Sequence, residues 1–427
     1  MDTTAVVLVM AAIVIWAAVS ARLERADLTA PIVFTAYGAA LAGLGLVNGP
    51  SSPETLKPLV EVTLVWVLFT DAARVRVPDL RDDAGRFVRL LGVGLPLTVL
   101  AGWGLASWLF PDLGVWLALL VAAALAPTDA ALGVPVVTNP VVPSRIRRLI
   151  TVESGLNDGI ATPVVMLAIA GAASAAGFAG AEGPGKALVE LAVGVAVGVA
   201  VGFIGGWLLR WSRSRGWAAE DFVGVAVLAL ALAAYASALT LHGNGFVAAF
   251  CGGLAFGAAA GPRGPSEVVF LEQASGLVSL LVWLGFGAIA VPMIIDRVSM
   301  SIVAYAVLSL TLVRMVPVAL ASIGAGLDRQ TVLFVGWFGP RGLASLVFAL
   351  LALEELGEAQ MEEAVVIIAL TVFLSVLAHG ASAAPLASRY GAAASTREPE
   401  PSGSVPDVPI RGLPRRGGGR AAHNHDP

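Results

Sequence analysis

Two short acidic motifs interrupt long apolar stretches of this sequence. They are Glu153-Ser154-Gly155-Leu156-Asn157-Asp158 and Ala126-Pro127-Thr128-Asp129. In a helix, residues four apart lie on the same face, so Ser154 stacks with Asp158 and the adjacent Glu153–Asn157 pair completes one polar stripe. Carboxylate, hydroxyl and carbonyl oxygens are the ligands that hard cations prefer, and a carboxylate can also carry a proton. The two motifs therefore predict a site where a small cation and a proton compete.

The composition places these motifs inside a membrane. Apolar residues make up 57% of the 427 residues and charged residues only 13%, and the mean hydropathy is +0.85. A soluble domain carries about twice that charged fraction. Ionisable side chains within a bilayer are costly and by default mark function. Packing between helices could use a single serine or asparagine, so the clustered acids favour a binding site over a packing role.

By length and hydropathy, the sequence predicts thirteen membrane spans, because a helix needs about 20 apolar residues to cross a bilayer. They run near residues 4–21, 30–47, 56–73, 88–110, 112–137, 149–173, 187–209, 220–240, 245–261, 268–295, 299–323, 331–353 and 364–386. We expect residues 1–390 to form one all-α transmembrane domain. Residues 391–427, rich in Ser, Pro, Gly and Arg, are expected to form a disordered tail.

The distribution of basic residues predicts the orientation. Fifteen arginines fall in the loops of one side, and only Lys57, Lys186 and Arg297 fall on the other. Because basic loops stay inside, the N-terminus is predicted to lie outside and the C-terminal tail in the cytoplasm.

Two predicted spans contain residues that break helices. The fifth span is interrupted at 126–129 and the twelfth at Gly339-Pro340-Arg341-Gly342. Proline removes a backbone donor, and irregular backbone at membrane depth survives only where protein or a cavity satisfies it. The breaks are seven spans apart, so the two spans are expected to run in opposite directions, within an inverted repeat of spans 1–6 and 8–13. Such paired breaks point to the substrate site of a transporter.

These motifs resemble those of the NhaP-type bacterial sodium/proton antiporters, relatives of the sodium/hydrogen exchangers. Further similar stretches are Gly339–Ala344, His379-Gly380 and Gly243–Phe250, and the similarity covers roughly residues 4–390. The resemblance implies exchange of Na⁺, or of K⁺ or Li⁺, for H⁺. It also implies a homodimer in the cell membrane and elevator-like alternating access by a mobile core that carries both broken helices.

Carried onto this sequence, the resemblance implies roles for individual residues. Asp158 is the acid that binds the cation and the proton, and the further ligands are Ser154, Asp129 and the carbonyl of Thr128. Asn157 helps to shape the site, and its pairing with Asp158 implies electroneutral exchange. Asp71 lies where some relatives carry another acid, but the local pattern differs, so either a ligand or a solvated helix end remains open.

Two arginines, Arg314 and Arg341, lie inside predicted spans, and each needs an anion because an unpaired buried guanidinium is too costly. In the family, a glutamate at the position of Glu153 pairs with an arginine. We favour Arg314 as its partner, and Arg341 could face the break of span 12 or serve Asp129. His379, near an inner helix end, could be a pH sensor because histidine in general titrates near neutrality, but a satisfied or solvated histidine is expected instead.

No nucleotide-binding loop is found, so we expect ion gradients to drive transport, without a cofactor, nucleic acid or enzymatic reaction. Two alternatives remain. A cation channel is disfavoured by the paired breaks and by the absence of a repeated carbonyl filter. A transporter of small organic anions could use the positive helix ends at the breaks, but the concentration of acids argues against it.

Overall fold

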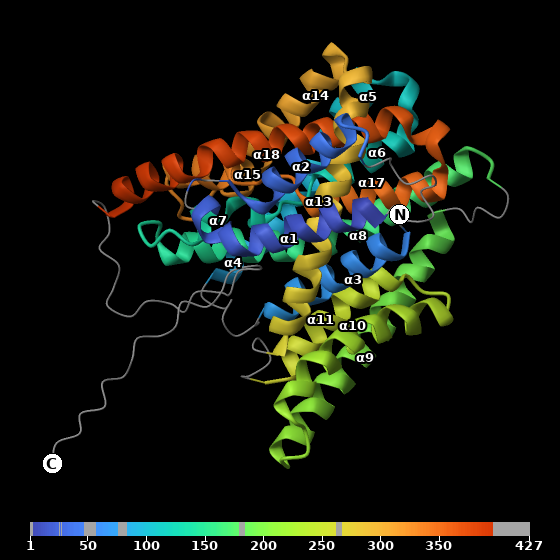
Figure 1. The fold of residues 1–427 in the computed structure, drawn as a ribbon, viewed down its shortest axis with the longest axis vertical. Helices are drawn as coiled ribbons and strands as arrows, with labels where there is room; N and C mark the ends of the chain where they lie inside the picture. Colours follow the sequence, from blue (N-terminus) through green and yellow to red (C-terminus); the bar gives the residue numbers. More distant parts are fainter. Residues whose placement is uncertain are drawn as a thin grey trace.

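The computed structural model describes residues 3–24, 26, 28–46, 57–75, 83–178, 184–261 and 267–395, and the regular structure of these residues is entirely helical (Figure 1). Each predicted span coincides with one helix or with consecutive helices. The helices are α1 (Thr3–Glu24), α2 (Ala30–Gly43), α3 (Lys57–Arg74), α4 (Ala84–Arg89), α5 (Leu95–Leu109), α6 (Gly114–Leu125), α7 (Val134–Val137), α8 (Ser144–Ala175), α9 (Pro184–Ser214), α10 (Glu220–Thr240), α11 (Gly245–Ala259), α13 (Val269–Arg297), α14 (Met300–Leu310), α15 (Leu312–Ala321), α16 (Arg329–Trp337), α17 (Leu343–Leu356) and α18 (Glu358–Ser395).

Long apolar helices make this a polytopic membrane protein. In the described part of the chain, eight helices are long and apolar enough to cross a bilayer, and three shorter apolar helices accompany them. Large hydrophobic side chains such as Val14, Phe203 and Ile295 are exposed on the outside, where a lipid environment satisfies them. The number of thirteen spans and the inverted repeat remain predictions.

Loops that the arginine count assigns to one side meet at one end of the molecule. The carboxylate of Asp83, just before α4, pairs with Arg86 of the same helix and with Arg145 and Arg148 of α8. Burial alone would raise the pKa of Asp83, but hydrogen bonds from Arg145 and Arg86 hold this pKa below its usual value. Arg86 Nε also donates to the carbonyl of Ala325, between α15 and α16, at 2.9 Å.

Loops assigned to the other side meet at the opposite end. Arg297 at the end of α13 pairs with Glu362 of α18, and the amide of Asn244 donates to the carbonyl of Glu190 at 2.8 Å. The loop that follows the fifth span and the loop that precedes the twelfth both contact the Asp83–Arg86 pair at the first end, through Arg145 and Ala325. Four of the arginines behind the orientation prediction lie outside the described residues: Arg25, Arg76, Arg81 and Arg263.

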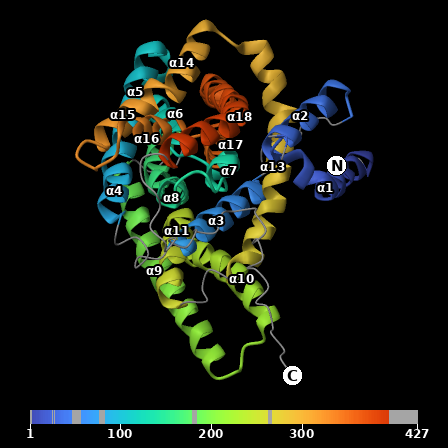
Figure 2. The same cartoon turned by 90° about the vertical axis from the view of Figure 1, so that its left-hand side faces the viewer.

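The helices form two groups. Figure 2 shows α5, α6 and α14 to α18 gathered in the upper part, α9 and α10 projecting below, and α13 running along the side. In the second group, α11 packs against α9 and α3, and α13 packs against α2. The groups meet where α8 and α17 contact α3, so residues on these three helices lie at the boundary between two bodies.

Four glycines bring α9 and α11 into backbone contact. Gly194, Gly198, Gly202 and Gly206 are buried on one face of α9, and a β-carbon at any of them would meet the backbone of α11 or, for Gly194, of its N-cap residue Asn244. Small residues at this spacing let membrane helices approach closely. The stripe is therefore a packing surface.

We expect Gly202→Ala to lower the free energy of unfolding by about 1–3 kcal/mol, because the added methyl collides with the carbonyl of Gly252 and must push α9 and α11 apart. Gly185→Ala on the same helix is the matched control, since its β-carbon would meet open space. Thermal unfolding of both purified variants checks this, and equal melting temperatures would contradict it.

The eleventh predicted span coincides with the candidate span Met300–Ala321, but its helix is interrupted once. Thr311, with φ −111° and ψ −92°, separates α14 from α15. Ser309 lies in the last turn of α14, where carbonyls lack helical partners, and its carbonyl oxygen lies 3.5 Å from Arg341 Nη2. The interruption places Arg314 in the first turn of α15.

The last helix extends past the predicted domain boundary at residue 390. Helix α18 continues to Ser395, and near its end Tyr390 stacks on Phe334 at 4.0 Å and shares a 2.7 Å hydrogen bond with Thr331. These contacts with α16 hold the helix in place. The rest of the predicted tail, 396–427, lies outside the described residues.

Candidate ion-binding site

The two broken spans meet at their interruptions. The amide of Asp129 donates to the carbonyl of Pro340 at 2.8 Å, and the amide of Leu343 donates to Asp129 Oδ2 at 3.1 Å. Gly342 lies so close that a β-carbon there would collide with the Asp129 side chain. The carboxylate thus sits at the N-terminus of α17, where free amides and the helix dipole favour negative charge.

Thr128 joins the first break to the polar stripe of α8. Its Oγ1 lies 2.9 Å from Ser154 Oγ and accepts a 2.7 Å hydrogen bond from Asn157 Nδ2. All three residues are buried, and Asn157 is fully inaccessible. Asn157 Oδ1 has no hydrogen-bond partner among the described residues. A buried acceptor without a donor costs free energy, and a bound cation or water would relieve that cost.

Asp158 lies one helical turn after Ser154 on α8 and is 7% exposed. The helix stays regular around it, and Thr162 donates to the Asp158 carbonyl at 2.8 Å. From α3, Asp71 packs beside the stripe, because a β-carbon on Gly155 would lie 3.7 Å from the Asp71 β-carbon. The structure thus places Thr128 with Ser154 and Asn157, Asp129 at the crossing of the two breaks, and Asp71 beside Gly155 from across the boundary between the helix groups.

An ion pair lies at the centre of this region. Arg314 Nη2 is 2.6 Å from Glu153 Oε1, with side chains 1% and 3% exposed. Of the two roles left open for Arg341, facing the break of span 12 or serving Asp129, the contacts of its guanidinium fit the first. Its Nη1 donates to the carbonyl of Gly339 at 2.9 Å, and its Nη2 faces Ser309. Arg341 therefore satisfies backbone groups freed by two helix interruptions.

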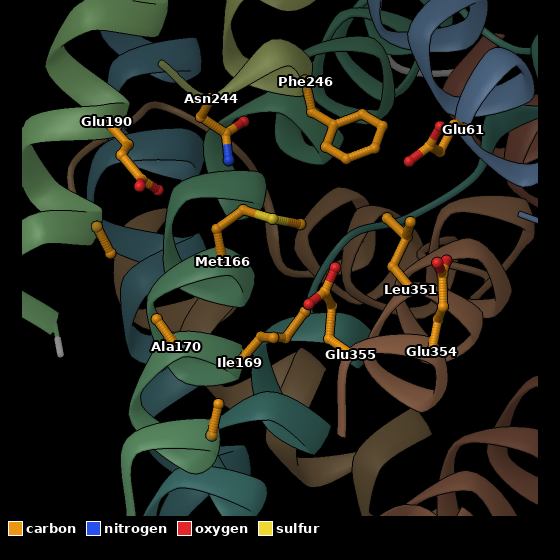
Figure 3. Close-up of a pocket in the computed structure, with 12 residues that line it drawn as sticks. Glu61, Met166, Ile169, Ala170, Glu190, Asn244, Phe246, Leu351, Glu354 and Glu355 are labelled. Carbon is orange, nitrogen blue, oxygen red and sulfur yellow. The ribbon is translucent and has the colours of Figure 1, made fainter. Parts of the chain in front are cut away.

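An acidic cavity of about 350 Å³ was missed by the sequence analysis. It lies between α3, α8, α9 and α17, and Figure 3 shows the carboxylates of Glu61, Glu190, Glu354 and Glu355 around it. Each glutamate is near a helix end and taken alone is typical of a solvated terminus, so no local pattern could have found the set. Met166, also in the lining, is eight residues after Asp158, about 12 Å along α8.

Comparison with known proteins identifies the family of the chain. The model of the transmembrane sodium/hydrogen exchanger family matches residues 8–389. Over 147 residues the chain is 33% identical to a Na(+)/H(+) antiporter of Saccharomyces cerevisiae. The matched region covers 30% of this chain and 15% of the yeast protein. The chain thus spans only a small part of that relative.

The fold is similar to that of the sodium proton antiporter MjNhaP1 from Methanocaldococcus jannaschii. Its structure at pH 8 superposes with a TM-score of 0.72 and 18% identity, covering 91% of this chain and 98% of that chain. A second MjNhaP1 structure, from electron microscopy, gives a TM-score of 0.70 at 18% identity, covering 93% and 99%. Crossed broken helices in an all-helical membrane fold define the class of secondary transporters rather than enzymes. Within that class, the chain belongs to the sodium/hydrogen exchanger family.

Proposed function

We propose that this chain exchanges Na⁺, or another small monovalent cation such as K⁺ or Li⁺, for H⁺. The observation that carries the proposal is the hydrogen-bonded set of Thr128, Ser154 and Asn157, all buried beside the break of the fifth span, with the buried Asp158 one helical turn after Ser154 on the same face of α8. A buried carboxylate is costly unless it holds a proton or a cation. Asp158 therefore binds one or the other in alternation.

The cation's ligands in this proposal are oxygens of both motifs. The Asp158 carboxylate supplies the charge, and Ser154 Oγ, the Thr128 carbonyl and Asp129 supply further oxygens. Asn157 orients Thr128 through its amide and offers its own Oδ1. The glutamates of the acidic cavity attract cations toward one end of the molecule, because clefts lined by one sign of charge raise the local counter-ion concentration.

Transport requires the site to face each side in turn. We propose that the helix group carrying α6, α8, α16 and α17 moves against the group of α3, α9, α11 and α13, by an elevator-like motion. The arginine distribution supports an N-terminus outside and a C-terminus in the cytoplasm, in the plasma membrane. Likeness to the NhaP-type antiporters supports a homodimer.

The charges around the site favour one-for-one exchange. At the crossing of the broken spans, the carboxyl groups of Glu153, Asp129 and Asp158 outnumber the guanidinium groups of Arg314 and Arg341 by one. Either a proton or a monovalent cation cancels that single negative charge. The moving group then carries the same net charge in both crossings, and membrane voltage does no work on the exchange.

We expect sodium-driven proton flux in proteoliposomes to be independent of membrane voltage. The potential is clamped at several values with valinomycin and potassium, and internal pH is followed by a trapped dye. Protein-free liposomes, treated in the same way, give the leak.

A rate that rises several-fold with voltage, or a net current during exchange, would contradict electroneutrality and indicate Asp129 as a second proton carrier. Downhill sodium flux without counter-movement of protons would identify a channel. Flux driven only by an organic anion would identify the remaining alternative. Potassium and lithium in place of sodium rank the substrates in the same assay.

A further inference from the structure

A fully buried histidine contacts the break of the twelfth span. His379, on α18, is 0% exposed. Its Nε2 lies 2.9 Å from the carbonyl oxygen of Trp337, the last residue of α16. Its Nδ1 lies 2.9 Å from the carbonyl oxygen of Ser375 and 3.2 Å from Ser375 Oγ. The Trp337 ring stacks on the imidazole with centroids 5.1 Å apart.

The neighbours of His379 on the same helix face contact the same break. The amide of Arg341 donates to Ser375 Oγ at 2.7 Å, and Trp337 Nε1 donates to Ser382 Oγ at 3.0 Å. Residues 375, 379 and 382 are spaced by four and three, so they share one face of α18. Together they form hydrogen bonds with polar groups at the break between α16 and α17. Irregular backbone at membrane depth needs such partners within the protein.

Hydrogen-bond geometry fixes the state of one ring nitrogen of His379, and the neighbouring charges bear on the other. A carbonyl only accepts, so Nε2 must carry a hydrogen to bond with Trp337. Nδ1 lies near the Ser375 carbonyl oxygen, which can only accept a hydrogen bond, and near Ser375 Oγ, which can donate to the Nδ1 lone pair, so the hydrogen bonds alone fit either a neutral or a doubly protonated ring. A second proton would place positive charge in a region that already contains Arg341 and Arg314, the charged groups whose fields reach the ring.

We propose that His379 is a positioning residue of the ion site, which as a neutral imidazole holds the Trp337 carbonyl and thereby sets the geometry of the broken span. The position of the break affects the ion site because Pro340 and Leu343, on the far side of the same break, form hydrogen bonds with the backbone and the carboxylate of Asp129. The inference rests on the proposed function, since it concerns the same ion site.

Two amide substitutions separate the two ring nitrogens. The amide nitrogen of glutamine can take the place of Nε2, whereas the shorter asparagine reaches only the place of Nδ1. We expect His379→Gln to keep an apparent KM for sodium within about threefold of the parent. His379→Asn should raise it about tenfold, the factor typical of one lost buried hydrogen bond, with a smaller change in maximal rate. The pH profile of His379→Gln should match that of the parent.

Equal behaviour of the two variants would overturn the positioning role, and a changed pH profile in His379→Gln would make His379 a pH sensor instead. Nitrogen NMR of [¹⁵N]histidine-labelled protein is independent of transport. It should show one protonated and one bare ring nitrogen for the signal lost in His379→Gln, across neutral pH. A doubly protonated ring would overturn the proposal. Absence of exchange in the parent, with this NMR signature present, would count against the proposed function alone.

Discussion

Asp158→Ala should abolish cation-driven proton exchange while the protein still folds and inserts. The residue is 7% exposed, and removing a buried acid removes a group that is costly without a proton or cation. The substitution removes the carboxylate at the C-terminal end of the polar stripe. We expect this loss of negative charge to weaken cation binding by about 3 kcal/mol or more, which is over a hundredfold. The measurement is sodium-induced proton flux in proteoliposomes, with thermal unfolding recorded on the same preparation.

Two further substitutions sharpen the test of Asp158. Asp158→Asn keeps the shape but cannot carry the proton or balance a cation, so it should be equally inactive. Asp112→Ala removes an exposed acid at a helix end and should exchange at the parental rate. Substantial sodium-driven flux in folded Asp158→Ala would remove this residue from the centre of the mechanism.

Glu153→Ala should lower the stability of the folded protein and not only its rate of exchange. The substitution leaves Arg314, which is 1% exposed, without the carboxylate that lies 2.6 Å away. Breaking a buried pair by removing one partner typically costs about 3–5 kcal/mol. We therefore expect a marked fall in the melting temperature in detergent, measured on purified protein.

The double variant Glu153→Leu, Arg314→Met provides the control. Replacing both members of a buried ion pair with apolar residues is often close to neutral for stability, so the double variant should recover most of the loss. The coupling between the two positions then follows from the double-mutant cycle. An unchanged melting profile in Glu153→Ala would show that the pair does not stabilise the fold.

The sequence alone was sufficient for the membrane class, for a helix or helices in each predicted span, and for the motifs of the site. A bilayer requires continuous apolar stretches of set length, and only helices or closed barrels can satisfy the backbone there. The polar stripe from Glu153 to Asp158 follows from helical periodicity. The breaks at 126–129 and 339–342 could be predicted because proline and glycine act locally.

Only the tertiary structure decided which groups meet. Hydropathy shows that Glu153, Arg314 and Arg341 are buried, but it does not show which arginine reaches the glutamate, since the partners are more than 150 positions apart. The interruption at Thr311 could not be predicted, because that position holds neither glycine nor proline. The acidic cavity and the contact of His379 with Trp337 arise from helices distant in the chain. Periodicity specifies the face that a helix buries, whereas the neighbour on that face depends on how all the helices pack together.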